Sequence, residues 1–188
     1  MIGRRFGIAA ISVAIALGAA FTIGHAAGLR LNLTDSAPHG LWLVQAADVA
    51  SIKRGALVEV CPPASPVVSV MVQRGYLSPG DCAGLAVTAL LKPVSAVPGD
   101  TIRLQHGQPA TVNGVALPNT VAVPAIPAWP DGTYTVEQGQ AWLFSSYSAG
   151  SFDSRYFGPV ELATVRGIAT PVAVHGDPAA ITTGVNHQ

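Results

Sequence analysis

A serine and a lysine in this chain have the types and surroundings of a nucleophile and its base. Ser36 opens the stretch Ser-Ala-Pro-His-Gly, and Lys92 opens the stretch Lys-Pro-Val-Ser-Ala-Val-Pro-Gly-Asp. A serine hydroxyl attacks a carbonyl group efficiently only when a base removes its proton, and a lysine is a base only as the neutral amine. Lys92 follows an uncharged run over residues 84–91, and burial lowers the pKa of a lysine because it disfavours the ammonium. The two segments therefore predict a hydrolase with a Ser36/Lys92 dyad.

Both residues also have ordinary structural interpretations. Asp-Ser-Ala-Pro is a common turn composition, and most lysines are solvated surface groups. A Ser/His site is a further alternative, because His39 follows Ser36 closely. We favour Lys92 as the base, since no acidic partner for His39 stands out in the sequence. The five histidines are dispersed, so the sequence predicts neither a metal site nor a cofactor.

A third polar segment lies near the C-terminus, at residues 151–159. It reads Ser-Phe-Asp-Ser-Arg-Tyr-Phe-Gly-Pro and places Asp153 two positions before Arg155. Alternating small polar and aromatic side chains are unusual in a plain connecting loop. The structural alternative is an exposed Asp–Arg pair, which contributes less than about 1 kcal/mol to stability.

The N-terminal stretch over residues 6–29 contains no Asp, Glu, Lys or Arg. As a helix it would extend about 36 Å, enough to cross a hydrocarbon core of about 30 Å. Arg4 and Arg5 precede it, which favours a cytoplasmic N-terminus and export of the remainder. A cleaved secretory signal is the alternative, because Gly and Ala residues within 24–27 resemble a cleavage site. The length of the stretch favours a retained anchor.

The composition agrees with an exported, membrane-attached chain. Of the 188 residues, 49% are hydrophobic and only 11% are charged, with a formal net charge of zero. No basic, aromatic-rich patch is present, so nucleic acid is not an expected partner. Cys61 and Cys82 are the two cysteines, and in an oxidising compartment an isolated pair predicts a disulfide. Such a bridge would stabilise the fold by about 3 kcal/mol in the chain-entropy model.

Short apolar runs broken by glycine and proline predict a mostly β domain after the anchor. The candidate strands are residues 40–44, 57–60, 67–72, 87–97, 101–104, 132–136, 141–145 and 164–174. Asn113-Gly114 predicts a type I′ hairpin turn within residues 110–117. Beyond the anchor only residues 46–52 show a weak helical period. The expected organisation is an anchor over 1–30, a folded domain over 31–176 and a flexible tail over 177–188.

Together the three polar segments resemble the sequence boxes of the type I signal peptidases, which are membrane-anchored Ser/Lys endopeptidases. The Ser-x-Pro box matches at Ser36 and Pro38, the lysine box at Lys92 and residues 98–100, and the last box within residues 151–158. The order, the spacing and the preceding anchor all match that family. The resemblance implies a signal-peptidase-like β-barrel or sandwich domain with one N-terminal transmembrane helix.

The resemblance also implies roles for individual residues. Ser36 would be the nucleophile and Lys92 the general base. The oxyanion hole would combine the Ser36 backbone N–H with the hydroxyl of Thr34, and such donors typically contribute about 3 kcal/mol to the transition state. Ser151 would orient the lysine amine.

Asp153 and Arg155 would hold the loop beside the lysine, and Asp153 is a candidate for a direct catalytic role. The chain departs from housekeeping members over residues 145–150, where it has Ser-Ser-Tyr-Ser-Ala-Gly instead of a Gly-Asp-Asn stretch. With the single anchor and the early cysteine pair, this departure resembles the TraF branch of conjugative-transfer peptidases. Members of that branch process a conjugative pilin precursor, and some join its new ends into a ring.

The resemblance thus implies a protein of the bacterial inner membrane with its catalytic domain in the periplasm. It would act without metal or cofactor on a pilin precursor or another exported preprotein. A general type I signal peptidase is the first alternative. A self-cleaving, repressor-like protease shares a related β core, but the anchor and the lack of a DNA-binding domain count against it. An alternative from a different class is a structural subunit of a pilus or secretion assembly.

Overall fold

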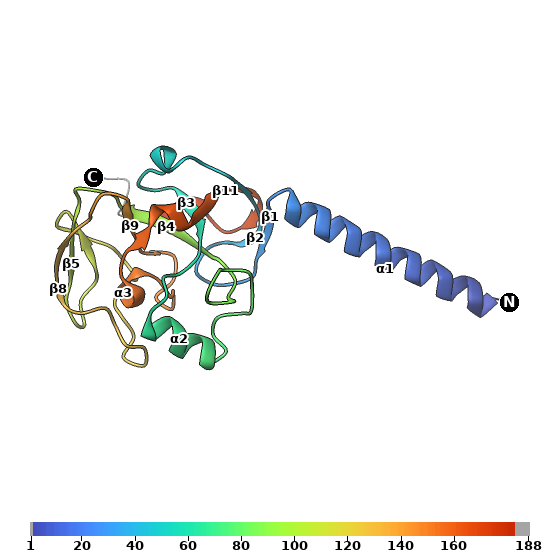
Figure 1. The fold of residues 1–188 in the computed structure, drawn as a ribbon, viewed down its shortest axis with the longest axis horizontal. Coiled ribbons are helices and arrows are strands. Elements are labelled where there is room, and N and C mark those ends of the chain that lie inside the picture. The colour runs from blue at the N-terminus through green and yellow to red at the C-terminus, as the bar shows by residue number, and fades with distance from the viewer. Residues whose placement is uncertain (1, 183–188) are drawn as a thin grey trace.

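The computed structural model describes residues 2–182, and residues 1 and 183–188 lie outside the description. Helix α1 (Ile2–Ala26) projects away from a β domain that contains the remaining described residues (Figure 1). Its segment Gly7–Ala26 is long and apolar enough to cross a membrane, with a mean hydropathy of 2.0, and it is not buried against the domain. The observed helix therefore covers most of the expected anchor.

A seven-stranded antiparallel sheet forms the larger part of the domain. Its strands, in spatial order, are β1 (Leu29–Asn32), β2 (His39–Gln45), β11 (Val165–His175), β3 (Leu57–Val60), β4 (Leu90–Ala96), β9 (Gln140–Leu143) and β10 (Val160–Glu161). Lys92 lies in β4, inside the sheet between β3 and β9. Strand β1 is an edge strand that leads from α1 into the loop carrying Ser36.

A smaller, four-stranded antiparallel sheet packs beside the first. Its order is β7 (Val115–Ala116), β6 (Thr111–Val112), β5 (Thr101–Leu104) and β8 (Gly132–Thr135). Strands β6 and β7 form the hairpin expected from Asn-Gly: Asn113 has φ 49° and Gly114 has φ 85°. Positive φ at both central residues is what a type I′ turn requires.

The expectation of a mostly β domain is confirmed, and most of the expected strands are present. Two of them have the expected bounds, Leu57–Val60 and Thr101–Leu104. The strand expected over 87–97 is shorter, Leu90–Ala96. Its first residues pair instead with the loop at 78–82, where Cys82 N donates to the carbonyl oxygen of Val87. The weak helical period at 46–52 corresponds to a short 3-10 turn, Val49–Ser51.

Two short α-helices and two further 3-10 turns complete the domain. They are α2 (Pro66–Gln73), α3 (Ser154–Phe157), Leu162–Thr164 and Pro178–Thr182. The last turn falls within the expected tail over 177–188, and the side chain of Ile181 in that turn is buried. This part of the tail therefore packs against the domain, while residues 183–188 lie outside the description.

The prediction of a strand over residues 67–72 is wrong, because these residues form α2. The Ser65 hydroxyl accepts a hydrogen bond from the Val68 N–H, and Pro66 occupies the first turn. A serine cap and an early proline are both favourable helix starts. Val68 and Met71 are buried and recur at helical spacing. The valines at 67, 68, 70 and 72 favour a strand, and the sequence prediction weighted them above the helix start signals.

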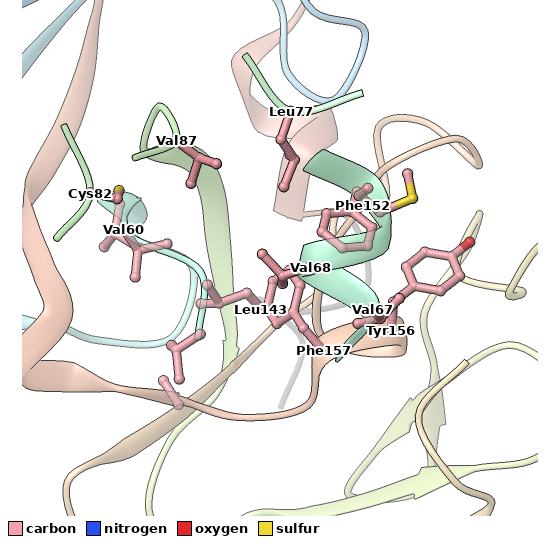
Figure 2. Packing of buried hydrophobic residues seen from close by; sticks show 14 of the residues in the cluster. Val60, Val67, Val68, Leu77, Cys82, Val87, Leu143, Phe152, Tyr156 and Phe157 are labelled. Carbon is pink, nitrogen blue, oxygen red and sulfur yellow. The ribbon is translucent and has the colours of Figure 1, made fainter. Parts of the chain in front are cut away.

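The largest hydrophobic cluster packs α2 and α3 against the seven-stranded sheet (Figure 2). Figure 2 shows Phe152, Tyr156 and Phe157 gathered around α2. The Phe152 ring stacks on Tyr156 with 5.6 Å between centroids and meets Phe157 edge-on at 5.3 Å. Because Phe152 directly follows Ser151, this cluster fixes the backbone of a predicted site residue.

A separate cluster supports the segment that carries Ser36. It contains Ala37, Trp42 and Ile181, all buried. The Trp42 indole also donates a hydrogen bond to the carbonyl oxygen of Pro38 at 3.1 Å. The turn Pro178–Thr182 therefore lies beneath the Ser36 segment, and it contributes an apolar side chain to its support.

The predicted disulfide is present between Cys61 and Cys82, with 5.6 Å between their Cα atoms. It joins the end of β3 to the loop that follows α2. Reduction is expected to lower the free energy of unfolding by about 3 kcal/mol, because the bridge restricts the unfolded chain. Urea unfolding of the full chain in detergent micelles, with and without reductant, measures this change. A C61A/C82A variant should be insensitive to reductant, and equal midpoints for the oxidised and reduced wild type would contradict the expectation.

Candidate active site

Lys92 is almost completely buried, with 3% of its surface exposed. It lies opposite Val58 in the register of β3 and β4, so both flanking strands restrict its position. Its Nζ donates a hydrogen bond to the Ser151 Oγ at 2.8 Å. Burial lowers the pKa of the Lys92 ammonium from 10.5 to about 8, because the charged form loses its hydration.

Two charged neighbours act on this amine in opposite directions. The carboxylate of Asp153 raises the pKa of Lys92, and the guanidinium of Arg155 lowers it, both by less than burial does. Asp153 and Arg155 are themselves fully buried and paired, with 2.8 Å between Arg155 Nε and Asp153 Oδ1. The structural alternative from the sequence, an exposed Asp–Arg pair, is therefore wrong, because this pair is buried.

The Asp153 carboxylate is occupied by hydrogen-bond donors on both oxygens. Oδ1 accepts from the N–H and Nε of Arg155, and Oδ2 accepts from Arg155 Nη2 and from the Ser145 N–H. The remaining donors of Arg155 bind backbone carbonyl groups, including those of Asn119 and Ala149. Because removing one partner of a buried pair typically costs about 3–5 kcal/mol, this network fixes the loop that presents Ser151.

Tyr76 holds the same loop from the outside. Its hydroxyl donates to the carbonyl oxygen of Gly150 at 2.9 Å, and its ring meets Phe152 edge-on with 6.1 Å between centroids. Sequence reasoning missed this contact because α2, which precedes Tyr76, was expected to be a strand. The helix start at Ser65 and Pro66 is the sequence signal that would have placed Tyr76 just after a helix.

Ser36 lies in the loop between β1 and β2 and is partly exposed. Its Oγ is 3.2 Å from the Oγ1 of Thr34, so the two predicted residues are adjacent. Among residues 2–182, no hydrogen bond joins Ser36 Oγ to Lys92 Nζ. Hydrogen bonds of catalytic groups are often long in enzymes without substrate and tighten in the complex, so direct contact of Ser36 with Lys92 remains a prediction.

Asn32 shapes the Ser36 loop, and sequence reasoning did not identify it. The residue is buried, and its Nδ2 donates to the carbonyl oxygens of Thr34, Ala37 and Pro38. Its Oδ1 accepts from the N–H and the hydroxyl of Thr34, the latter at 2.7 Å. A buried asparagine with this many partners imposes the loop conformation. The sequence around it shows only an alternation of leucine with polar residues, Leu29-Arg30-Leu31-Asn32-Leu33.

Ser145 connects the Ser36 loop to the Lys92 network. Its hydroxyl donates to the Ser36 carbonyl oxygen at 2.7 Å, and its N–H donates to Asp153 Oδ2 at 3.0 Å. Its carbonyl oxygen accepts from Arg155 Nη2. The sequence indicated this position only as part of a departure from housekeeping signal peptidases. The structure thus joins both halves of the predicted site through one buried serine.

His39 is oriented by a different partner. Its Nε2 lies 2.9 Å from Asp35 Oδ1, and both side chains are exposed. Within the described part of the chain, His39 forms no hydrogen bond with Ser36. Asp35 is therefore the acidic partner of His39, which the sequence did not indicate.

The described part of the chain contains no group of three His, Cys, Asp or Glu side chains that could hold a metal ion.

Comparison with known proteins accounts for nearly the whole chain. The signal peptidase family, peptidase S26, matches residues 2–173. A plasmid transfer protein TraF of Escherichia coli is 34% identical over 155 residues, which cover 79% of this chain and 84% of that protein. A conjugal transfer protein TraF of Agrobacterium tumefaciens strain 15955 is 36% identical over 167 residues, which cover 87% of this chain and 90% of that protein.

A signal peptidase I from Enterococcus faecalis V583, known from a crystal structure, is also similar to this chain. The TM-score is 0.36 at 21% identity, and the match covers 63% of this chain and 96% of that one. The family match includes Ser36, Lys92 and the network around Asp153. The chain therefore belongs to the signal peptidase family, peptidase S26, and is a relative of the TraF proteins of plasmid and conjugal transfer.

Proposed function

We propose that this protein is a membrane-anchored serine endopeptidase in which Ser36 is the nucleophile and Lys92 the general base. The observation that carries the proposal is the buried amine of Lys92, which is held by Ser151 and has a pKa of about 8. With this pKa about one tenth of the amine is neutral at pH 7, against less than about one thousandth for a solvated lysine, so Lys92 can act as a general base. Ser145 supports the pairing, because it ties the Ser36 segment to the loop that holds this amine.

The proposed reaction has two acyl-transfer steps. Ser36 Oγ attacks the scissile carbonyl carbon while Lys92 Nζ takes the hydroxyl proton. Collapse of the tetrahedral intermediate breaks the C–N bond, and the leaving amine takes that proton from Lys92. Water, which Lys92 deprotonates, attacks the resulting ester on Ser36. The bond between the acyl carbon and Ser36 Oγ then breaks, Ser36 Oγ takes the proton back from Lys92, and the carboxylic acid product leaves. If an amine attacks the ester instead of water, the product is a new amide bond.

The oxyanion of the intermediate would be held by Thr34 and by the backbone of Ser36. The Thr34 hydroxyl lies 3.2 Å from Ser36 Oγ, and Asn32 fixes its position. The Ser36 N–H has no hydrogen-bond acceptor within residues 2–182, so it is a free donor beside the nucleophile. Preorganised donors of this kind typically contribute about 3 kcal/mol to the transition state.

Ser151, Asp153 and Arg155 complete the proposed machinery. Ser151 orients the Lys92 amine through the 2.8 Å hydrogen bond. Asp153 acts on the reaction through the charge that it places near Lys92, and Arg155 offsets that charge. Arg155 also fixes the loop through its bonds to backbone carbonyl groups.

The proposed substrate is a conjugative pilin precursor, which the enzyme would cleave and, by amine attack on the Ser36 ester, join into a ring. Support comes from the TraF relatives, whose names assign them to plasmid and conjugal transfer. Helix α1 would anchor the protein in the bacterial inner membrane, with the β domain in the periplasm. The second candidate is a general type I signal peptidase, which the S26 family match favours. A structural subunit of a pilus or secretion assembly would not require a buried, perturbed lysine.

Mass spectrometry of a co-expressed pilin precursor tests the proposal. We expect wild-type protein to give a shortened product lighter by one further water, as ring closure requires. Ser36→Ala and Lys92→Met should leave the precursor intact. A shortened linear product would favour the general signal peptidase. An unchanged precursor with wild-type protein, or cleavage that survives both substitutions, would contradict the peptidase assignment.

The pH dependence of kcat/KM provides a second test. Activity should rise with pH and level off above about 8, because only the neutral Lys92 amine accepts the proton. Below that value the neutral fraction falls by about tenfold per pH unit, so the rate near pH 6 should be about one hundredth of the plateau. Initial rates on a soluble peptide containing the cleavage site measure the profile. Activity that persists in Lys92→Met and disappears in His39→Ala would contradict the choice of base.

Substitution of Ser145 tests the connection between the two halves of the site. Ser145→Ala removes the hydrogen bond to the Ser36 carbonyl oxygen. We expect kcat to fall about tenfold with little change in KM, because the substitution loosens the nucleophile and not the substrate contacts. Ser69→Ala, on the exposed face of α2, is the matched control and should have no effect. Equal kcat values for the two variants would show that Ser145 does not position Ser36.

A further inference from the structure

Arg30 joins helix α1 to the β domain through its guanidinium. Nη1 donates to the carbonyl oxygens of His25 and Leu29, at 2.8 and 3.1 Å. Nε and Nη2 donate to the two carboxylate oxygens of Glu59, at 2.6 and 3.4 Å. His25 belongs to the last turn of α1 and Glu59 to β3. One side chain therefore contacts both the end of the helix and the sheet.

Glu59 is a fixed attachment point inside the sheet. Its side chain is 7% exposed, and Arg30 is its ion-pair partner. Its neighbour Val58 lies opposite Lys92 in the register of β3 and β4. A buried carboxylate is stable only when it is paired and hydrogen-bonded, so Glu59 holds the guanidinium in place. The end of α1 is thereby attached to the strands that position the proposed base.

The junction between α1 and the domain contains no free linker. Gly28 has φ 91°, and its carbonyl oxygen accepts a hydrogen bond from the Val44 N–H at 2.8 Å. A Cβ at Gly28 would lie 2.2 Å from the carbonyl oxygen of Val44, so the backbone there is packed directly onto β2. Strand β1 begins at Leu29, immediately after this contact. The helix therefore passes into the sheet without a flexible spacer.

Strand β1 then leads to the nucleophile. Arg30 and Asn32 are two positions apart, so their side chains lie on the same side of the strand, and Asn32 fixes the Ser36 loop. Leu31 and Leu33 are 61% and 72% exposed, so the domain does not hold β1 through their side chains. From Leu29 to Ser36 the extended chain spans at most about 25 Å. Arg30 holds the membrane end of this short connection, and Asn32 holds its catalytic end.

We propose that the Arg30–Glu59 pair is a positioning device that fixes the orientation of the catalytic domain relative to the anchor helix. The pair keeps Ser36 at a set height above the membrane surface, where a precursor anchored in the same membrane exposes its scissile bond. The inference rests on the proposed peptidase function. It concerns only substrates held in the membrane, because a peptide free in solution reaches Ser36 whatever the orientation of the domain.

The test compares two substrates with the full-length protein in lipid vesicles. One is a pilin precursor with its membrane segment, reconstituted in the same vesicles, and the other is a soluble peptide with the same cleavage sequence. The variant is R30M/E59L, because replacing both partners by apolar side chains removes the guanidinium bonds without leaving a buried charge. We expect kcat/KM to fall about tenfold on the anchored precursor and to change less than about twofold on the peptide.

Arg54→Met is the matched control. Arg54 is 20% exposed, close to the 22% of Arg30, and pairs with Asp100 inside the domain without a bond to α1. Its ratio of precursor rate to peptide rate should equal that of the wild type. Ser36→Ala should cleave neither substrate, and peptide cleavage by that variant would refute the proposed function itself, separately from this inference.

Two results would overturn the proposed role of the pair. An unchanged precursor rate in R30M/E59L would show that the orientation does not depend on it. An equal loss on both substrates would assign the pair to stability alone, provided that Glu59→Gln gives the same result. Glu59→Gln retains an acceptor for Arg30 but removes the charge. A selective loss on the precursor with Glu59→Gln would support the proposal even if the double variant folds poorly.

Discussion

The amine of Lys92 is buried inside the seven-stranded sheet, and the neighbouring contacts of the site are arranged around it. A charged ammonium at this position loses its hydration, which lowers the pKa of Lys92 to about 8. A carboxylate in direct contact would restore the charge. In the structure the Ser151 hydroxyl contacts Nζ, and Asp153, whose carboxylate raises the pKa of Lys92, is bound to Arg155. Arg155 thus has two effects, since it fixes the loop and limits the charge that Asp153 imposes on the amine.

This arrangement also explains how residues far apart in the sequence are held together. The strand of Lys92 is paired with β3 and β9 on its two sides, so the Ser36 loop must be held relative to this strand. Ser145 provides that connection, because it bonds to the Ser36 carbonyl oxygen and to Asp153. Asn32 determines the shape of the loop itself. These contacts are small and polar, yet they lie at buried positions where an unmade hydrogen bond costs about 1–3 kcal/mol.

Sequence reasoning succeeded where one local pattern determines the result. The apolar runs around β3 and β5, the Asn113-Gly114 turn and the cysteine pair are such patterns, and all are present. It failed at α2, where β-branched residues outweighed the helix start at Ser65 and Pro66. Ser145 and Asn32 could not be found, since their importance comes from partners distant in the chain. Single-residue types carry no signal of such contacts.

Titration of the Lys92 amine shows directly whether this residue can act as the base. The chain contains two lysines, Lys53 and Lys92, so a Lys53→Arg variant labelled with 13C-lysine gives one side-chain signal. The chemical shift of its Cε, followed against pH by NMR for the full chain in detergent micelles, reports the ionisation of Nζ. We expect a midpoint near 8. A midpoint near 10.4, the value of a solvated lysine, would leave less than about one thousandth of the amine neutral at pH 7 and would contradict its role as base.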